Sequence, residues 1–354
     1  MTTNEKLLNE IIYHYVILQS YVSHLIQKST SLINKSNREL MAKLYIVLDE
    51  MSHTNFQIKT LKSKLQTDIE ITGLTQLIND ELSKFSEYEY SYRLALLERL
   101  LPPNVISKYK LQNIKSELLL SLIFNKPFQG MTLLDWLKKL EQDRINRVVN
   151  AIRNSYAQGD SNEQTLAKIK GTKDKNYRDS VLAVVAVNAA SIIKTAISNT
   201  STTVQSVFAQ KNDKIIKCKQ WVSVLDNRTT PTCMIRDSLL YTLDNEPIRH
   251  NVPYGDGPGR IHFCCRSIET LVIRSFDEMG IIINDEDVTR DSMEGQVPAK
   301  TSYLEWLKKQ SHERQEQILG VERARMLRDG EITVDQFFTR DGHFLTLDEL
   351  RRIH

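Results

Sequence analysis

The sequence predicts an α+β protein that is mainly α, with long N-terminal and central helices, a small mixed α/β module containing Cys and His residues, and C-terminal helices. Apolar residues recur at helical spacing through most of the first 210 residues. Glycine and proline, which interrupt helices, concentrate later: eight of 12 glycines and five of 8 prolines follow Gln220. All four cysteines lie between Cys218 and Cys265, so they belong to one segment.

The chain of 354 residues is long enough for about two folding units. A hydrophobic fraction of 41% supports a packed core without disulfides as its main support. Changes in composition divide the chain into a helical N-terminal region, a basic helical region, a small α/β module, and a linker with C-terminal helices. These regions are expected at residues 1–130, 131–210, 211–290 and 291–354, with the linker at 291–298.

Two apolar stripes predict core-facing helices in the N-terminal region. The first contains Leu8, Ile12, Tyr15, Val16, Val22 and Ile26, and the second contains Leu74, Leu77, Ile78, Leu82, Phe85, Tyr88, Tyr92, Leu96 and Leu100.

The basic helical region carries clear helix boundaries. Thr132 with Asp135 indicates a helix start, and the helix is expected to end near Gly159. Ser161 with Gln164 is typical of a capping box for a short helix that stops at Gly171. A long helix is expected from about residue 177 to residue 208. The apolar face of the first helix is assigned to Leu134, Leu137, Ile145, Val148, Ile152 and Tyr156.

The net charge of +3 hides an uneven distribution, because residues 1–100 carry −1, residues 101–220 carry +10 and residues 221–354 carry −6. The basic middle is either a solvated helical face or a surface that meets phosphates. Candidate contacts with the phosphates of DNA lie on and beside the polar face of the first basic helix: Lys138, Lys139, Arg144, Arg147 and Arg153.

No stable membrane span is expected, because the least charged windows are interrupted by polar residues or are too short. The N-terminus has Glu5 where an export signal would carry positive charge. Residues 11–27 leave open a membrane-active amphipathic segment, although their polar interruptions suit helix packing better.

Beyond residue 215 the pattern changes to short strand-like runs at 215–216 and 221–225, followed by a loop at 227–231. The loop YGDGPGR at 254–260 lacks the strand and helix context of a dinucleotide site and is given no phosphate-binding role. The last helices are expected to begin near Ser302.

Cys233, His262 and Cys265 are candidate metal ligands, since His262 and Cys265 have a spacing that can bring both to one ion across a turn. A zinc site would need a fourth ligand, for which Cys218 is the named candidate and Cys264 an alternative. Two other interpretations of these cysteines remain: a Cys233–Cys265 contact without a metal, and thiols that are simply buried. A catalytic interpretation would make Cys233 the nucleophile and His262 its general base. Asp226 or Asp237 would then orient the His262 ring.

Several separated motifs resemble the phage Mu F-like head morphogenesis family, whose members are also called minor head or minor capsid proteins. The central match is WVSVLDNRTTPTCMIRD from Trp221, followed by IHFCCRS. GDSNEQTLAKIKGT upstream, and TSYLEWLKKQSHERQEQILGVERARML and FFTRDGHFLTLDELR downstream, extend the resemblance over residues 145–354. The family's motif residues fall on Trp221, Asp226, Arg228, Thr229, Cys233, Asp237, His262, Cys265 and Arg266.

The resemblance implies a virion component that acts in head morphogenesis inside the head near the portal vertex, after assembly in the host cytoplasm. Its implied partners are the portal protein and other head proteins, with packaged or ejected double-stranded DNA as a further candidate. The five basic residues of the first basic helix are then candidate contacts with DNA or with the portal. Some members carry cysteines at the positions of Thr230 and Ser267, and their absence here weakens a four-ligand zinc site. The family brings no settled catalytic activity, so the chain is expected not to be an enzyme and to have no certain cofactor. A metal-dependent hydrolase or nuclease that uses the Cys/His module is the alternative.

Overall fold

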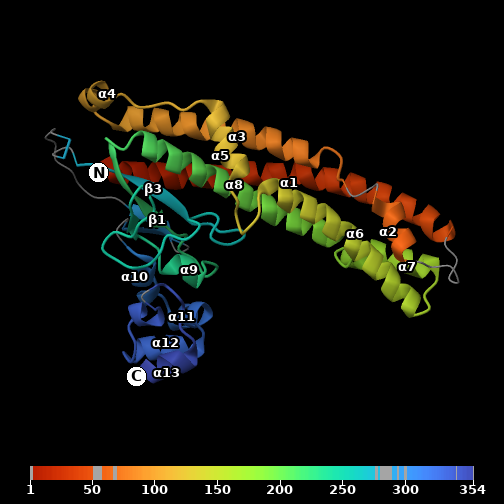
Figure 1. Ribbon diagram of the computed structural model, residues 1–354. Helices are drawn as coiled ribbons and strands as arrows, with labels where there is room; N and C mark the ends of the chain where they lie inside the picture. Colours follow the sequence, from red (N-terminus) through yellow and green to blue (C-terminus); the bar gives the residue numbers. More distant parts are fainter. Residues whose placement is uncertain are drawn as a thin grey trace. The chain divides into compact units, whose positions relative to one another are not determined.

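The computed structural model confirms a mainly helical chain with a small antiparallel sheet (Figure 1). It describes residues 3–50, 58–66, 70–275, 278–279, 289–292, 295–298, 301–339 and 341–353. The described α-helices are α1 (Thr3–Glu50), α2 (Ile58–Gln66), α3 (Leu74–Leu100), α4 (Pro103–Tyr109), α5 (Ser116–Asn125), α6 (Leu133–Ala157), α7 (Asn162–Lys170), α8 (Ala183–Lys211), α9 (Pro231–Met234), α10 (Tyr303–Lys308), α11 (His312–Leu319), α12 (Val321–Arg328) and α13 (Leu347–Ile353). The strands are β1 (Ile216–Val222), β2 (Leu240–Tyr241), β3 (Ile268–Ile273), β4 (Thr289–Ser292) and β5 (Gly295–Pro298).

The chain forms two compact units, each built from segments that are far apart in the sequence. Unit 1 contains Met1–Leu18, Ser86–Ile123 and Ser198–His354, and unit 2 contains Gln19–Phe85 and Phe124–Ile197. Helices α1, α3, α5 and α8 have residues in both units.

Unit 2 has a core of aliphatic side chains from α1, α2, α6 and α7, centred on fully buried residues such as Leu44, Ile145 and Ile152. The predicted helix boundaries here are confirmed. The Thr132 side chain accepts a hydrogen bond from the Asp135 N–H, Ser161 and Gln164 form a capping box, and Gly171 ends α7 at a φ of 79°.

Two details of unit 2 differ from the sequence prediction. Leu134 is exposed, because the apolar face of α6 runs through Leu133 and Leu137 instead. The helix expected from residue 177 begins at Ala183, because residues 173–180 form a short 3₁₀ turn and a loop in which Asn176 and Tyr177 have left-handed φ values of 48° and 57°.

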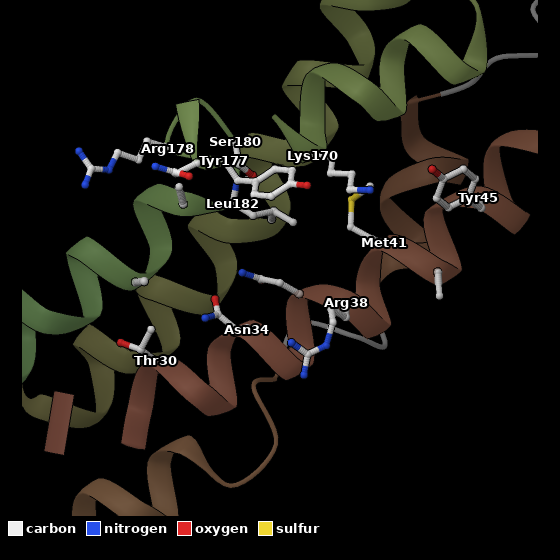
Figure 2. A pocket seen from close by; sticks show the side chains of 15 residues that line it. Thr30, Asn34, Arg38, Met41, Tyr45, Lys170, Tyr177, Arg178, Ser180 and Leu182 are labelled. Carbon is white, nitrogen blue, oxygen red and sulfur yellow. The ribbon is translucent and has the colours of Figure 1, made fainter. Parts of the chain in front are cut away.

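A cavity of about 930 Å³ in unit 2 is lined by residues of α1 and of the segment from the end of α7 to the start of α8 (Figure 2). No sequence motif pointed to it.

In unit 1, β1 lies between β2 and β3 and is antiparallel to both; Figure 1 labels β1 and β3. The strand is continuous where the sequence predicted two short runs separated by polar residues. Lys219 stays within the strand although it is 1% exposed, because its ammonium group donates to the Asn245 side chain and lies over the Tyr254 ring. Buried partners therefore allow a charged residue to occupy a central strand.

The buried face of the N-terminal part of α1 also differs from the predicted stripe. Leu8 and Val22 are buried as expected, but Val16 is 57% exposed, and the buried face runs through Leu7, Ile11, His14 and Leu18. The polar residue His14 can occupy this buried face because Glu89 and Tyr92 contact its ring.

His14 belongs to a buried network of polar side chains in unit 1. Its Nε2 lies 2.7 Å from Glu89 Oε1, and its ring stacks on Tyr92 at 3.8 Å between centroids. Glu89 also pairs with Arg93, whose Nε donates to Gln205 at 3.1 Å. Each buried charge therefore has an opposite charge or a hydrogen-bond partner.

The C-terminal helices pack around Tyr303, Trp306, Leu307 and Phe337. Ser302 starts α10 with a capping box, which confirms the expected start of these helices. The predicted linker at 291–298 differs from the structure, since β4 and β5 pair there as antiparallel strands; residues 293–294 lie outside the described residues.

Candidate metal-binding site

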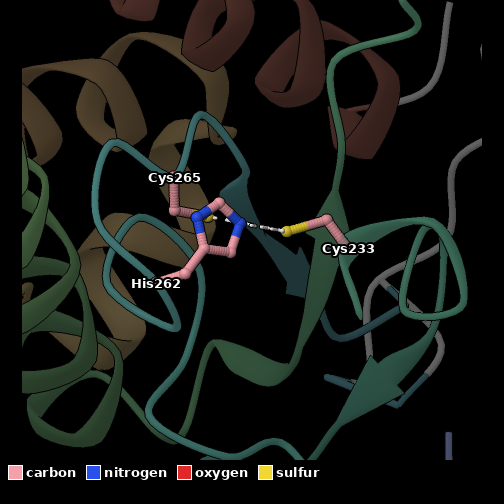
Figure 3. A group of neighbouring side chains, drawn as sticks. All are labelled: Cys233, His262 and Cys265. Carbon is pink, nitrogen blue, oxygen red and sulfur yellow. Dashed lines mark hydrogen bonds between the residues drawn. The ribbon is translucent and has the colours of Figure 1, made fainter. Parts of the chain in front are cut away.

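Three side chains that are far apart in the sequence meet beside the sheet of unit 1. Cys233 lies on α9, a single turn that begins with Pro231 at a position where helices tolerate proline. His262 and Cys265 come from the loop that leads into β3. All three are drawn in Figure 3.

The metal-ligating atoms of these residues all lie within 4.8 Å of one another. Cys233 Sγ is 3.4 Å from His262 Nε2 and 3.6 Å from Cys265 Sγ (Figure 3). Both cysteines are buried and His262 is half-buried. The group could therefore hold a metal ion, and no carboxylate belongs to it among the residues described.

The orientation of His262 leaves the nitrogen that faces the sulfurs available as a ligand. Its Nδ1 lies 2.9 Å from the carbonyl oxygen of Phe263. Since a carbonyl only accepts, Nδ1 carries the proton of this bond, and Nε2 faces Cys233 and the hydroxyl of Thr230, 3.0 Å away. A backbone carbonyl that fixes the far nitrogen is typical of metal-ligating histidines.

The electrostatics of the group favour one thiolate. The hydrogen bond from Cys265 lowers the pKa of Cys233 to about 4 against the effect of burial, with His262, Ser267 and Thr230 also contributing. The same hydrogen bond raises the pKa of Cys265, and the hydrogen bond to Cys233 raises the pKa of His262. These shifts favour a thiolate at Cys233 that accepts a hydrogen bond from the Cys265 thiol.

The surrounding residues fix the turn that carries Cys233. The Ser223 hydroxyl donates to the Cys233 carbonyl at 2.9 Å and lies 3.3 Å from the Ser267 hydroxyl. Trp221, Tyr241 and Tyr254 pack with the two cysteines in one buried cluster. The Arg236 guanidinium lies over the Trp221 ring, 5.8 Å from its centroid.

Asp226 and Asp237, the candidate orienting acids of the catalytic reading, are both engaged elsewhere. Both Asp226 oxygens accept from Arg266 at 2.6 Å, and burial is outweighed by this ion pair, so that the pKa of Asp226 is lowered. Asp237 accepts from the backbone N–H groups of Ser223 at 2.6 Å and Tyr303 at 2.8 Å. These contacts hold the module together.

The remaining motif residues take structural positions. Arg228 donates its backbone N–H to Asp226 at 3.0 Å while its side chain is exposed, and the Thr229 hydroxyl donates to the Val224 carbonyl. Cys218, the predicted fourth ligand, lies buried on β1 and is not among the three residues that come together. Cys264 is half-buried and is also outside the group.

The candidate DNA or portal contacts on α6 divide into two sets. Lys138, Lys139, Arg147 and Arg153 are exposed, with Lys139 paired to Asp143 at 3.2 Å. Arg144 is a correction, because its side chain is 0% exposed and donates to Ser36 at 2.7 Å. Its position on the packed face of the helix makes it a structural residue of unit 2.

Sequence reasoning missed Ser223 as a support for Cys233, and no spacing rule could have found it, because the contact joins a strand end to a turn. It also missed the cations around the unit 2 cavity. Their signal was available in the segment KGTKDKNYR at 170–178, where basic residues gather around a tyrosine.

Comparisons of the chain with protein-family models, with curated proteins and with solved structures found no match. Within the described ranges, none of the helices has the length and apolar character needed to cross a membrane.

Proposed function

We propose that the chain is a minor head protein of the Mu F-like type, which acts in head morphogenesis at or near the portal vertex. The observation that supports this best is the arrangement of the motif residues. Trp221, Asp226, Cys233, Asp237, His262, Cys265 and Arg266 lie in one module, where each contributes to the metal-ligand group or to a contact that holds its loops.

The metal held by the group is proposed to be zinc. Two sulfurs and one imidazole nitrogen are ligands that zinc prefers. Ligands at zinc bond lengths in a tetrahedron place two sulfurs about 3.8 Å apart, and a sulfur and a nitrogen about 3.6 Å apart. The corresponding distances here are 3.6 Å and 3.4 Å.

Two further positions support the resemblance. Thr230 and Ser267, where some family members carry cysteines, both contact the group: the Thr230 hydroxyl lies 3.0 Å from His262 Nε2, and the Ser267 side chain hydrogen-bonds Cys233. A cysteine at either position would stand next to the other ligands. This chain would complete the coordination with a hydroxyl or with water.

The module supports binding rather than turnover. The acids that could orient His262 or act as a base are occupied by Arg266 and by backbone N–H groups. A zinc ion here would stabilise the turn at Cys233 against the loop at 262–265, in the manner of a small structural site.

The alternative is a metal-dependent hydrolase or nuclease, and one observation favours it. A group with three protein ligands leaves a coordination position for water, as catalytic zinc sites do. Replacing His262 by Asn separates the two functions. Loss of bound zinc and of thermal stability, with no change in hydrolysis of DNA or of ester substrates, supports the structural role; an intact fold that loses a measurable hydrolysis supports the enzyme.

Contact with double-stranded DNA is proposed as a second role of the exposed α6 cations Lys138, Lys139, Arg147 and Arg153. The proposed location is the virion, inside the head near the portal, with the host cytoplasm as the proposed place of assembly. The test is whether binding to a duplex weakens with salt, since cations that neutralise phosphates release counterions.

A pull-down against the portal protein of the same phage tests the main proposal. Purified chain is mixed with portal, with and without duplex DNA, at low and moderate salt. Portal binding that persists at moderate salt is the expected result. Absence of portal binding together with metal-dependent cleavage of the added DNA would replace the proposal by the enzyme.

A further inference from the structure

The cavity of unit 2 has a lining that is charged with one sign. Its side chains include Arg38 from α1, Lys170 at the end of α7, and Arg178 in the loop before α8, and none of the described residues that line it is Asp or Glu. None of these three cations forms an ion pair with another residue in the described part of the chain, and all three are exposed. They are therefore available to an anionic ligand.

The same cavity presents aromatic rings and amide groups beside the cations. Tyr45 and Tyr177 are 54% and 44% exposed, and Figure 2 shows both among the side chains that line the space. Asn34, Asn37 and Asn176 add polar groups that both donate and accept.

The loop between α7 and α8 holds Tyr177 in an unfavourable backbone conformation. Tyr177 has a φ of 57°, which a bulky residue rarely adopts, and its N–H donates to the Thr172 carbonyl at 2.8 Å. Asp179, the acid nearest in sequence, accepts from the N–H and the hydroxyl of Thr172 at 2.9 Å each. The loop thus fixes the tyrosine at the cavity while Asp179 is bound to Thr172.

We propose that this cavity is a binding site for single-stranded nucleic acid, with Arg38, Lys170 and Arg178 contacting phosphates and Tyr177 and Tyr45 stacking on bases. Cations that follow a backbone, combined with exposed aromatic rings, are the arrangement that binds single strands without sequence preference. A duplex keeps its bases stacked on one another and offers no free base face to a tyrosine. The proposal does not depend on the portal-binding role.

The test uses the full chain and a fluorescein-labelled oligothymidylate, with binding followed by fluorescence anisotropy. Replacing Arg38, Lys170 and Arg178 together by Gln is expected to weaken binding at least tenfold. A matched control replaces three exposed cations outside the cavity, Lys308, Lys309 and Arg352, by Gln and is expected to change affinity less than twofold. An equal loss in both variants would overturn the proposal in favour of diffuse charge attraction.

A second pair of variants tests the stacking. Tyr177→Asn removes the ring while the new residue accepts a left-handed backbone, and about a tenfold loss is expected. Tyr13→Gln, at an exposed tyrosine of α1 outside the cavity, is expected to bind as the parent does. Unchanged binding in Tyr177→Asn would contradict the assignment.

Competition distinguishes the ligand classes. Unlabelled oligothymidylate is expected to displace the probe, whereas a duplex of equal length and thymidine monophosphate are expected to compete at least tenfold less well. Equal competition by the mononucleotide would contradict the proposal, because it would show a site that binds a phosphate and not a strand. Equal competition by the duplex would overturn the single-strand assignment. With three phosphates contacted, affinity should fall roughly 20-fold between 50 and 200 mM salt.

Discussion

At the scale of single residues, the site depends on side chains whose environment changes their chemistry. Cys233 and Cys265 are the same residue type, yet the pKa of Cys233 is lowered and that of Cys265 is raised, because one thiol donates to the other sulfur. A bound metal would displace the proton of Cys265 and compete with protonation of His262, so metal affinity should fall as the pH is lowered.

Zinc stoichiometry tests the ligand set. Cys233→Ser is expected to lose most of the bound zinc, because it removes a sulfur from a group of three. Cys218→Ala, which removes a buried thiol outside the group, is expected to bind one zinc ion like the parent chain. Zinc measured by elemental analysis after dialysis checks both, and zinc loss in Cys218→Ala would restore Cys218 as a ligand.

The Asp226–Arg266 pair provides a test of the loop contacts. Asp226→Asn is expected to lower the free energy of unfolding by about 2 kcal/mol, because the half-buried Arg266 guanidinium loses its charge-assisted acceptor. Asp348→Asn removes one partner of an exposed pair and should cost less than about 0.5 kcal/mol. Urea unfolding measures the free energy of unfolding of both variants. Equal losses would show that the Asp226–Arg266 pair stabilises the fold no more than an exposed pair does.

His14 predicts a pH dependence of stability. Burial, and then the charge of Arg93, lower its pKa from 6.5 to about 4. The unfolded chain therefore takes up a proton before the folded chain does, so the stabilisation is complete above pH 6.5 and is lost as the pH falls from 6.5 towards 4. The full loss is about 3 kcal/mol.

Comparison with His14→Gln isolates this contribution. Gln keeps a donor for Glu89 and does not titrate, so the variant should show a flatter dependence of the unfolding free energy between pH 6.5 and 4. Denaturant unfolding at several pH values is the measurement. The same slope in both proteins would contradict the assignment to His14.

At the scale of elements, helix ends set where the functional segments lie. The capping box at Ser161 starts α7, Gly171 ends it, and the loop that follows carries Arg178 and Tyr177 to the cavity of unit 2. Likewise, Ser302 starts α10 next to Tyr303, whose hydroxyl donates to the Asp226 carbonyl at 2.9 Å. The residues that cap these helices therefore also determine where side chains of the cavity and of the Cys/His module lie.

Removing the α7 cap tests this role. Ser161→Ala is expected to destabilise the chain by about 1 kcal/mol, because the Gln164 N–H loses its acceptor. Ser23→Ala removes an exposed hydroxyl that bonds only within its own helix and should be nearly neutral. Thermal unfolding compares the two, and equal melting temperatures would contradict the capping contribution.

At the scale of the whole molecule, the two units have separate cores, and we therefore expect two transitions in thermal unfolding. The Cys/His group lies in unit 1, and the core formed around Leu44 and Ile152 belongs to unit 2. A ligand that binds only the folded form of one unit stabilises that unit.

Removal of the metal should therefore lower the thermal stability of unit 1 more than that of unit 2. Chelation is expected to lower the melting temperature of the transition assigned to unit 1 by about 5–10 °C, with little change in the other. Differential scanning calorimetry of the zinc-loaded chain, with and without chelator, makes the comparison. Cys233→Ser should be insensitive to the chelator, and an equal shift in both transitions would argue against a site confined to unit 1.

Sequence patterns alone predict the helical class, the caps at Thr132, Ser161 and Ser302, and the three candidate ligands Cys233, His262 and Cys265. These features depend on residues close together in the chain or on residue type, and the sequence contains both kinds of information.

Tertiary packing determines which groups meet. It buried His14, Arg144 and Lys219, since a polar residue is buried when distant partners compensate its lost hydration. It left Cys218 out of the ligand group and brought Arg38 to the same cavity as Arg178. Residues separated by more than a hundred positions become neighbours only through packing, which no local pattern records.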